Sequence, residues 1–257
     1  RDRMSERLLE LLGADRGIVC AVGAGGKKTT LYALANAHPG RVAVTATVFM
    51  TAFSRRLGAY RLITEEPDLP ATVAATGEHR RVAYARPSEK PGRVAGAPPD
   101  VIGDCHRQGA FDLTLVKADG ARMRAIKAPA PDEPVIPESA TTVLCIVSAA
   151  AIGEPLDERI AHRPERIEAV TDLRAGDPIT PGAVGRLLSA NNGGLQGIPD
   201  QASVVAVINA VDEADRRGLA GEAARAALQQ GGDRIAGVVL TCHRGGQNPV
   251  LGAVERE

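Results

Sequence analysis

The amino-acid sequence predicts an α/β protein built on a mostly parallel β-sheet with helices on both faces. Short apolar runs rich in Val, Ile, Leu and Ala alternate along the chain with segments of helical pattern. Near-continuous apolar runs are typical of parallel strands covered on both faces, and the alternation is typical of β–α–β units. A glycine-rich loop between the first apolar run and a helical segment supports the same fold class.

The predicted elements follow one another along the chain. A helix over residues 3–13 ends at Gly13, because glycine is a frequent helix stop. The apolar runs place strands at 18–22, 41–47, 81–84, 113–118, 142–149, 204–209 and 235–241. Helical patterns lie at 29–37, 51–57, 99–108, 181–189 and 213–230. We expect one domain over residues 1–257, with irregular excursions at about 85–99 and 121–140, where prolines and glycines interrupt the alternation.

The composition excludes several functional classes. The 257 residues carry no net charge, and aromatic residues make up 2% of them, so neither a basic field nor stacking platforms favour nucleic-acid binding. The chain shows no signal peptide and no apolar run of membrane-spanning length. We therefore expect a cytoplasmic protein with neither a membrane nor a nucleic-acid partner.

The four cysteines are far apart in the sequence. Cys20 and Cys145 lie in apolar runs, which predicts small buried side chains. The other two begin the Cys-His pairs 105–106 and 242–243, for which ordinary loop positions are favoured over a shared metal ion. The sequence contains neither a nucleophile elbow nor an H-E-x-x-H motif, so it does not support hydrolysis through a side-chain nucleophile.

The loop after the first strand predicts a phosphate-binding site. Glycines let backbone N–H groups turn inward, a helix N-terminus adds positive potential, and a lysine adds a full charge. The predicted phosphate-binding residues are Gly23, Ala24, Gly25, Gly26, Lys27, Lys28, Thr29 and Thr30. The loop departs from the G-x-x-x-x-G-K-[ST] pattern, since Lys28 stands at the hydroxyl position, and a plain glycine-rich turn is the alternative.

Polar residues follow two later strands. Asp119 follows an apolar strand, in the position of the acidic residue that orients Mg²⁺ beside a phosphate loop, so we predict that it positions a metal ion or water. The alternative is a helix cap or a turn, because Asp-Gly is a common turn dipeptide. Asn209 and Asp212 keep the spacing of an N-K-x-D base-recognition motif with Ala210 in place of its lysine. For Asp212, a role as N-cap of the predicted helix 213–230 is favoured equally.

The proline-rich segment 121–140 follows Asp119 closely, so it can lie over the phosphate end of the sheet. Its charged residues either face a ligand or are solvated, and they are Arg122, Arg124, Lys127, Asp132 and Glu133. We expect the polar residues 162–165 to lie on the protein surface.

Together these segments resemble the YqeC family. The resemblance rests on residues 22–27, 117–122, 127–129, 133–137, 162–163, and Asn209 with Asp212, in this order. It extends from about residue 16 to residue 245, and the Lys-Ala-Pro…Glu-Pro-Val-Ile-Pro run is its most specific part.

The resemblance implies a P-loop NTPase-like protein that takes part in maturing selenium-dependent molybdenum hydroxylases, by making or inserting a selenium cofactor. It implies ATP or GTP with Mg²⁺ as cofactors, and such a hydroxylase or its cofactor as partner. Lys27 and the loop would hold phosphates, Asp119 would position metal or water, and Asn209 and Asp212 would contact the base. A small-molecule kinase or ligase, and a non-catalytic adaptor with a degenerate site, are the alternatives.

This chain departs from the family pattern where Lys28 replaces threonine, Lys117 replaces glutamate and Ala210 replaces lysine. The first two changes put positive charge where a metal would bind, so the sequence supports nucleotide binding more strongly than hydrolysis. We hypothesise that Lys28 and Lys117 supply part of the charge neutralisation normally given by Mg²⁺. The alternative is that both lysines point outward.

Overall fold

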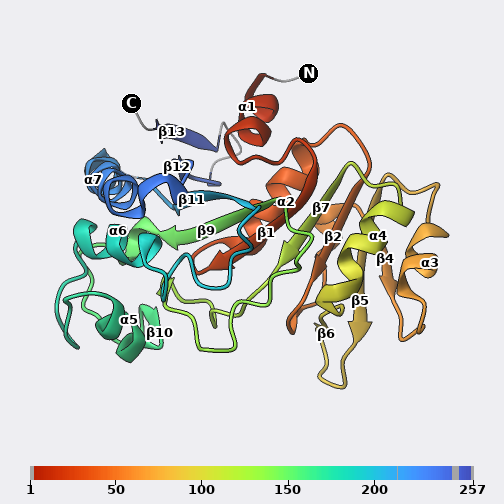
Figure 1. The fold of residues 1–257 in the computed structure, drawn as a ribbon, viewed down its shortest axis with the longest axis horizontal. Coiled ribbons are helices and arrows are strands. Elements are labelled where there is room, and N and C mark those ends of the chain that lie inside the picture. The colour runs from red at the N-terminus through yellow and green to blue at the C-terminus, as the bar shows by residue number, and fades with distance from the viewer. Residues whose placement is uncertain (1–2, 213, 245–248, 256–257) are drawn as a thin grey trace.

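The computed structural model describes residues 3–212, 214–244 and 249–255. In it, the chain is built around a central β-sheet (Figure 1). The strands are β1 (Gly17–Gly23), β2 (Val42–Ala46), β3 (Met50–Thr51), β4 (Tyr60–Ile63), β5 (Arg81–Pro87), β6 (Arg93–Ala95), β7 (Leu113–Lys117), β8 (Ile126–Lys127), β9 (Thr142–Ser148), β10 (Ala161–His162), β11 (Ser203–Asn209), β12 (Gly237–Thr241) and β13 (Val250–Glu255). The α-helices are α1 (Arg3–Leu11), α2 (Lys27–Ala37), α3 (Leu69–Ala74), α4 (Ile102–Gln108), α5 (Pro164–Val170), α6 (Pro181–Ser189) and α7 (Ala214–Gly231). Short 3₁₀ turns are η1 (Arg55–Leu57), η2 (Pro99–Val101), η3 (Ala149–Ala151) and η4 (Gly232–Arg234).

Eleven strands form the main sheet, in the order β13-β12-β11-β9-β1-β7-β2-β5-β6-β3, with β4 also paired to β5. The pairings from β12 to β5 are parallel, as is that of β4 with β5, whereas β13, β6 and β3 pair antiparallel. Strand β1 therefore lies between β7 and β9 (Figure 1). After β1 the chain continues to β2, on the β7 side of β1, whereas after β7 it crosses to β9, on the other side of β1. The strand order thus reverses at β1, and ligands of open α/β sheets bind at such a reversal.

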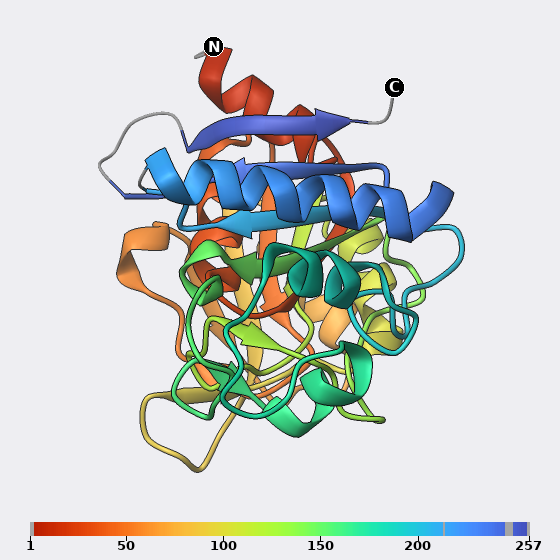
Figure 2. The same cartoon turned by 90° about the vertical axis from the view of Figure 1, so that its left-hand side faces the viewer.

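Helices cover both faces of the sheet. Helices α1 and α2 pack against one apolar cluster, which includes Val19 and Ala21 of β1. Helices α3 to α7 pack against the other, which includes Cys20 and Val22 of the same strand. Figure 2 shows α7 along β11 and β12. The predicted α/β fold with helices on both faces is confirmed, because alternate residues of each buried strand enter opposite cores.

The helix predicted at 51–57 is wrong. Only η1 is helical there, and Met50 and Thr51 form β3, which pairs with β6. Gly58 ends the turn in the left-handed conformation, at φ 61. Pairing with β6 therefore prevails over the local helical pattern.

Several short elements have no clear signal in the sequence, among them β4, α3, β8, β10 and α5. Each has only two to seven residues, fewer than a periodic pattern needs to stand out. The excursion at 85–99 contains the β5–β6 hairpin. The excursion at 121–140 crosses the carboxyl edge of the sheet, where Val135 N–H donates to Ala118 O at 2.9 Å.

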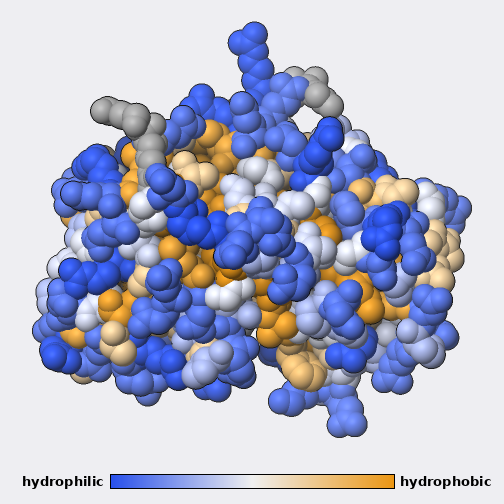
Figure 3. All heavy atoms as spheres, in the orientation of Figure 1, coloured by the Kyte–Doolittle hydropathy of each residue, from blue (hydrophilic) through white to orange (hydrophobic). Residues whose placement is uncertain are grey.

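Hydrophilic side chains are spread over the face shown in Figure 3, with apolar residues in separate patches between them. None of the helices in the described part of the chain combines the length and the apolar character needed to cross a membrane.

Candidate functional site

The glycine loop lies at the carboxyl ends of three neighbouring strands. Gly23, Gly25 and Gly26 have φ values of 93°, 88° and 127°, a region that side-chain-bearing residues rarely adopt. Ala24 N–H donates to the Ile146 carbonyl at the end of β9, at 2.9 Å. A Cβ at Gly25 would lie 2.5 Å from Ser148 Cβ. The glycines are therefore required for the loop to approach the ends of the neighbouring strands.

Helix α2 begins directly after this loop, without a side-chain cap. Gly26 is the N-cap residue, and the first helical hydrogen bond is from Thr30 N–H to Gly26 O, at 2.9 Å. The N–H groups of the first turn have no carbonyl partner within the helix, and the helix dipole makes this end positive. Together they provide donors and potential for an anion.

Lys27 and Asp119 form a buried ion pair beside the loop. Lys27 Nζ lies 2.6 Å from Asp119 Oδ1 and also donates to the Gly23 carbonyl. The other oxygen, Asp119 Oδ2, accepts the Gly23 N–H at 2.9 Å. The two side chains are 5% and 2% exposed. The glycine loop and the end of β7, far apart in the sequence, thus meet through these groups.

Lys127 of β8 approaches the same carboxylate from the proline-rich segment. Its Nζ lies 3.0 Å from Asp119 Oδ2 and 2.7 Å from Glu133 Oε2, and donates to Gly120 O at 2.6 Å. Arg163, which precedes α5, in turn donates to the Glu133 carboxylate at 2.8 and 3.3 Å. Of the charged residues in segment 121–140, Lys127 and Glu133 face the site, while Arg122 and Asp132 are exposed.

Lys117 is the third lysine of the cluster. It ends β7 and donates from Nζ to Asp119 O at 2.7 Å. Burial, and then the neighbouring charge of Lys27, lower the pKa of Lys117 to about 8. Burial also lowers the pKa of Lys27, opposed by the attraction of Asp119. These lysines would be stabilised by an additional negative charge.

We define the lysine cluster as Lys27, Lys117, Lys127 and Arg163 with the carboxylates Asp119 and Glu133. The four cations exceed the two carboxylates by two positive charges. Buried ionised groups require compensating charge. The cluster therefore has the charge to hold an anion such as a phosphate group.

The remaining predicted phosphate-site residues lie around the loop in different environments. Lys28 turns to β3, where Nζ donates to Thr51 Oγ1 at 2.7 Å. Thr29 is exposed, and buried Thr30 Oγ1 lies 3.4 Å from His243 Nε2. Of the two lysines that the hypothesis paired, Lys117 enters the cluster and Lys28 does not.

The predicted base-recognition residues are engaged within the protein. Asn209 Nδ2 donates to the Gly25 carbonyl at 2.9 Å, and Oδ1 accepts from Thr241 Oγ1 at 3.0 Å. Asp212 forms ion pairs with Arg216 and Arg244, both at 2.8 Å. Helix α7 is described from Ala214 onward, so its predicted first residue, Glu213, lies outside the described residues.

The residues around Asp119 do not fit Mg²⁺. Both carboxylate oxygens face ammonium groups, and Lys28 replaces the hydroxyl that a phosphate loop offers to a metal. Mg²⁺ prefers a near-octahedral set of oxygen ligands. The described part of the chain contains no group of three or more His, Cys, Asp or Glu side chains that could hold a metal ion, which also leaves the two Cys-His pairs separate.

Sequence reasoning left open whether Lys127 and Glu133 face a ligand or are solvated, and it missed Arg163 as a partner in this site. The expectation that residues 162–165 lie on the surface is wrong for Arg163, whose side chain is half-buried against Glu133. The signal that could have found it is the pairing of β8 with β10, which sets Lys127 opposite His162. These strands have two residues each, too few for detection from the sequence.

Two comparisons with known proteins agree on one family. A family model described as "YqeC protein" matches residues 19–165. The chain is also similar to an "Uncharacterized protein YqeC" of Escherichia coli (strain K12), with 26% identity over 203 residues that cover 77% of this chain and 78% of the relative.

We predict that Gly25→Ala destabilises the protein more than Gly92→Ala. Both positions have positive φ, 88° and 70°, but a Cβ at Gly92 would meet nothing within 4 Å. The free energy of unfolding of Gly92→Ala should therefore fall only by the cost of the left-handed backbone, about 1–3 kcal/mol, whereas that of Gly25→Ala should fall further because its Cβ would clash with Ser148. Urea unfolding of both variants measures this difference, and equal losses would contradict the tight packing of the loop.

We predict that the Glu133 carboxylate stabilises the fold in a pH-dependent way. Burial acts to raise its pKa, but hydrogen bonds from Arg163 and Lys127 outweigh this and lower it from 4.5 to about 2. Because the folded-state pKa is depressed, the stabilisation is present above the unfolded pKa and is lost as pH falls through about 2.

The difference in unfolding free energy between wild type and Glu133→Gln should accordingly shrink as the pH is lowered toward about 2 in urea titrations. Glu138→Gln, at an exposed position of the same segment, is the matched control. A difference that stays constant across this range would show that Glu133 does not depend on its cationic partners.

Proposed function

Because the chain belongs to the YqeC family and its glycine loop ends in a buried lysine cluster, we propose that it is a P-loop-like nucleotide-binding accessory protein. We assign it to the maturation of selenium-dependent molybdenum hydroxylases, on the family resemblance. The observation that carries the nucleotide proposal is the convergence of Lys27, the Gly23 N–H and Asp119 beside the uncapped start of α2.

In this proposal the loop and α2 hold the phosphates of ATP or GTP. The N–H groups of the first helical turn donate to phosphate oxygens, and Lys27 moves from the Gly23 carbonyl to the ligand. Lys117 and Lys127 neutralise further phosphate charge from the β7 and β8 sides. The role of these residues is positioning and electrostatic stabilisation.

Asn209 acts in this proposal through the loop. Its amide holds the Gly25 carbonyl at 2.9 Å, and Thr241 fixes the amide from the other side. The loop glycines lack side chains that could restrict them, so a fixed hydrogen bond to Gly25 pre-organises the cradle. Asp212 remains the candidate for base contact, if a ligand displaces Arg216 or Arg244.

A small-molecule kinase or ligase is the second candidate function. It is favoured by a pocket whose lining includes Gly23 of the glycine loop and Asp119, both of which belong to the predicted phosphate site. Such a pocket provides space for a second ligand next to the nucleotide, which a protein that binds nucleotide alone does not need.

We predict that Lys27→Met weakens nucleotide binding by at least about tenfold, because a charge-assisted hydrogen bond contributes about 1.5–3 kcal/mol. Isothermal titration calorimetry with ATP, GTP and their diphosphates measures the loss. Lys90→Met, an equal charge change at an exposed position of the β5–β6 hairpin, is the control. Unchanged affinity in a folded Lys27→Met protein would refute the phosphate-loop assignment.

We predict that removing Mg²⁺ changes nucleotide affinity by less than about threefold, because the carboxylate predicted to orient the metal, Asp119, is paired with the ammonium groups of Lys27 and Lys127. The measurement is the same titration with Mg²⁺ and with a chelator. In the double variant Lys28→Thr/Lys117→Glu, which restores the family residues at these two positions, binding should become dependent on Mg²⁺. Complete loss of wild-type binding on chelation would exclude neutralisation by lysines.

A further inference from the structure

A second group of cations lies where the proline-rich segment meets β10. Strand β8 pairs with β10 in parallel, and Lys127 is in register with His162. The turn before β8 is fixed to the same strand pair, because Ala125 N–H donates to Ile160 O at 2.9 Å. Residues aligned on neighbouring strands point to the same side of a sheet, so His162 lies on the side of Lys127. The lysine cluster therefore continues outward from Lys127 to His162.

Positive charge surrounds the His162 imidazole. Burial lowers its pKa, and so do the charges of three cations, Arg163, Lys127 and Arg122. The carboxylate of Glu133 acts in the opposite direction, but it is already paired with Arg163 and Lys127. A negatively charged ligand at His162 would relieve this repulsion.

Hydrogen-bond donors remain available in this group. In the part of the chain that the structure describes, the side chains of Arg122 and His162 have no hydrogen-bond or ion-pair partner. Arg163 donates two of its five N–H groups, both to Glu133. Arg122 is exposed, and His162 and Arg163 are half-buried, so a molecule from solvent can reach all three.

Both arginines have a strained backbone. Arg122 and Arg163 have φ values of 45° and 59°, and Met123, next to Arg122, has a φ of 59°. These are three of the five non-glycine residues with positive φ in the described part of the chain. Such conformations are costly for residues with side chains and tend to gather at ligand-binding sites, where the surrounding structure imposes them. The tertiary structure thus holds two arginines next to His162 in conformations that they do not favour.

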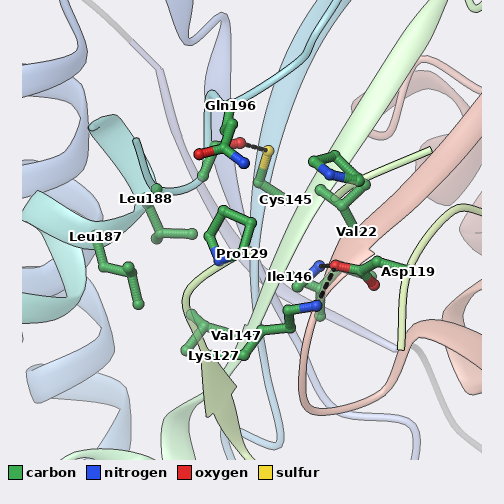
Figure 4. A pocket seen from close by; sticks show the side chains of 14 residues that line it. Val22, Asp119, Lys127, Pro129, Cys145, Ile146, Val147, Leu187, Leu188 and Gln196 are labelled. Atoms are coloured by element: carbon green, nitrogen blue, oxygen red, sulfur yellow. Dashed lines mark hydrogen bonds and ion pairs between the residues drawn. The ribbon is translucent and has the colours of Figure 1, made fainter. Parts of the chain in front are cut away.

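We propose that Arg122, His162 and Arg163 bind a phosphate-type oxyanion, and we call them the outer anion site. Guanidinium groups donate paired hydrogen bonds that match the oxygens of such an anion, and the imidazole adds one more donor. Lys127 connects this site with the glycine loop, since it pairs with Asp119 (Figure 4) and is in register with His162. The ligand class is a small molecule that carries a phosphate group or a similar tetrahedral dianion.

This inference deepens the proposed function, and it rests on that function for one point, which is that the oxyanion is a second ligand beside a bound nucleotide. Binding of the oxyanion itself can be measured without nucleotide. The two proposals therefore fail separately. The nucleotide proposal fails through calorimetry of Lys27→Met, and the outer anion site fails through titration of an oxyanion that is followed at His162.

The experiment titrates the full chain with sodium sulfate, which stays a tetrahedral dianion between about pH 5.5 and 8, the range in which histidine titrates. NMR signals of the imidazoles follow His162, with His79, which precedes β5, as the control signal. We expect sulfate to raise the pKa of His162, because the anion stabilises the protonated imidazole. Sulfate affinity should therefore increase as the pH falls through that pKa. Acetate, with a single charge, should bind about 3- to 10-fold more weakly.

Two variants test the site residue by residue. Arg122→Gln should weaken sulfate binding about 3- to 10-fold, whereas Arg7→Gln, the same change at an exposed position of α1, should leave it unchanged. In His162→Gln, sulfate affinity should no longer increase at lower pH. Three results would overturn the proposal: a His162 pKa that sulfate does not change, equal affinities for sulfate and acetate, or equal losses in the two arginine variants.

Discussion

The ion pairs of Asp119 with Lys27 and Lys127 hold the functional edge of the molecule together. One carboxylate at the end of β7 joins the glycine loop, the first turn of α2 and the proline-rich segment that crosses the sheet. All three side chains are buried, so loss of one partner would leave an uncompensated charge in a region of low dielectric. The conformations of these segments thus depend on each other.

Such a cluster is poorly explained by stability alone. Burying ion pairs costs desolvation energy that the Coulomb attraction only partly repays, and well-packed apolar side chains often stabilise a core equally well. Burial and, after it, repulsion from the charge of Lys27 lower the pKa of Lys117. Electrostatic strain of this kind is expected where an anionic ligand completes the charge balance.

The strand order brings a second feature to the same place. Since β1 lies between β7 and β9, the glycine loop touches the end of one neighbour and the carboxylate after the other. A small pocket lined by Val22, Val147 and Leu188 begins where α6 and the proline-rich segment pack against these strand ends. An apolar cavity and a cationic cradle therefore share Asp119, as is common where ligands bind at the carboxyl edge of an open sheet.

The sequence alone determined the α/β class, most long strands, the glycine loop and the carboxylate at the end of β7, because periodicity and glycine placement are local signals. It also identified Lys117 as a charge near Asp119, since residues two apart share one side of a strand. Only the tertiary structure decided that Lys127, Glu133 and Arg163 join them, while Lys28 turns to Thr51. The partner of a charged side chain depends on which distant segments cross the same sheet edge, and no local pattern records that crossing.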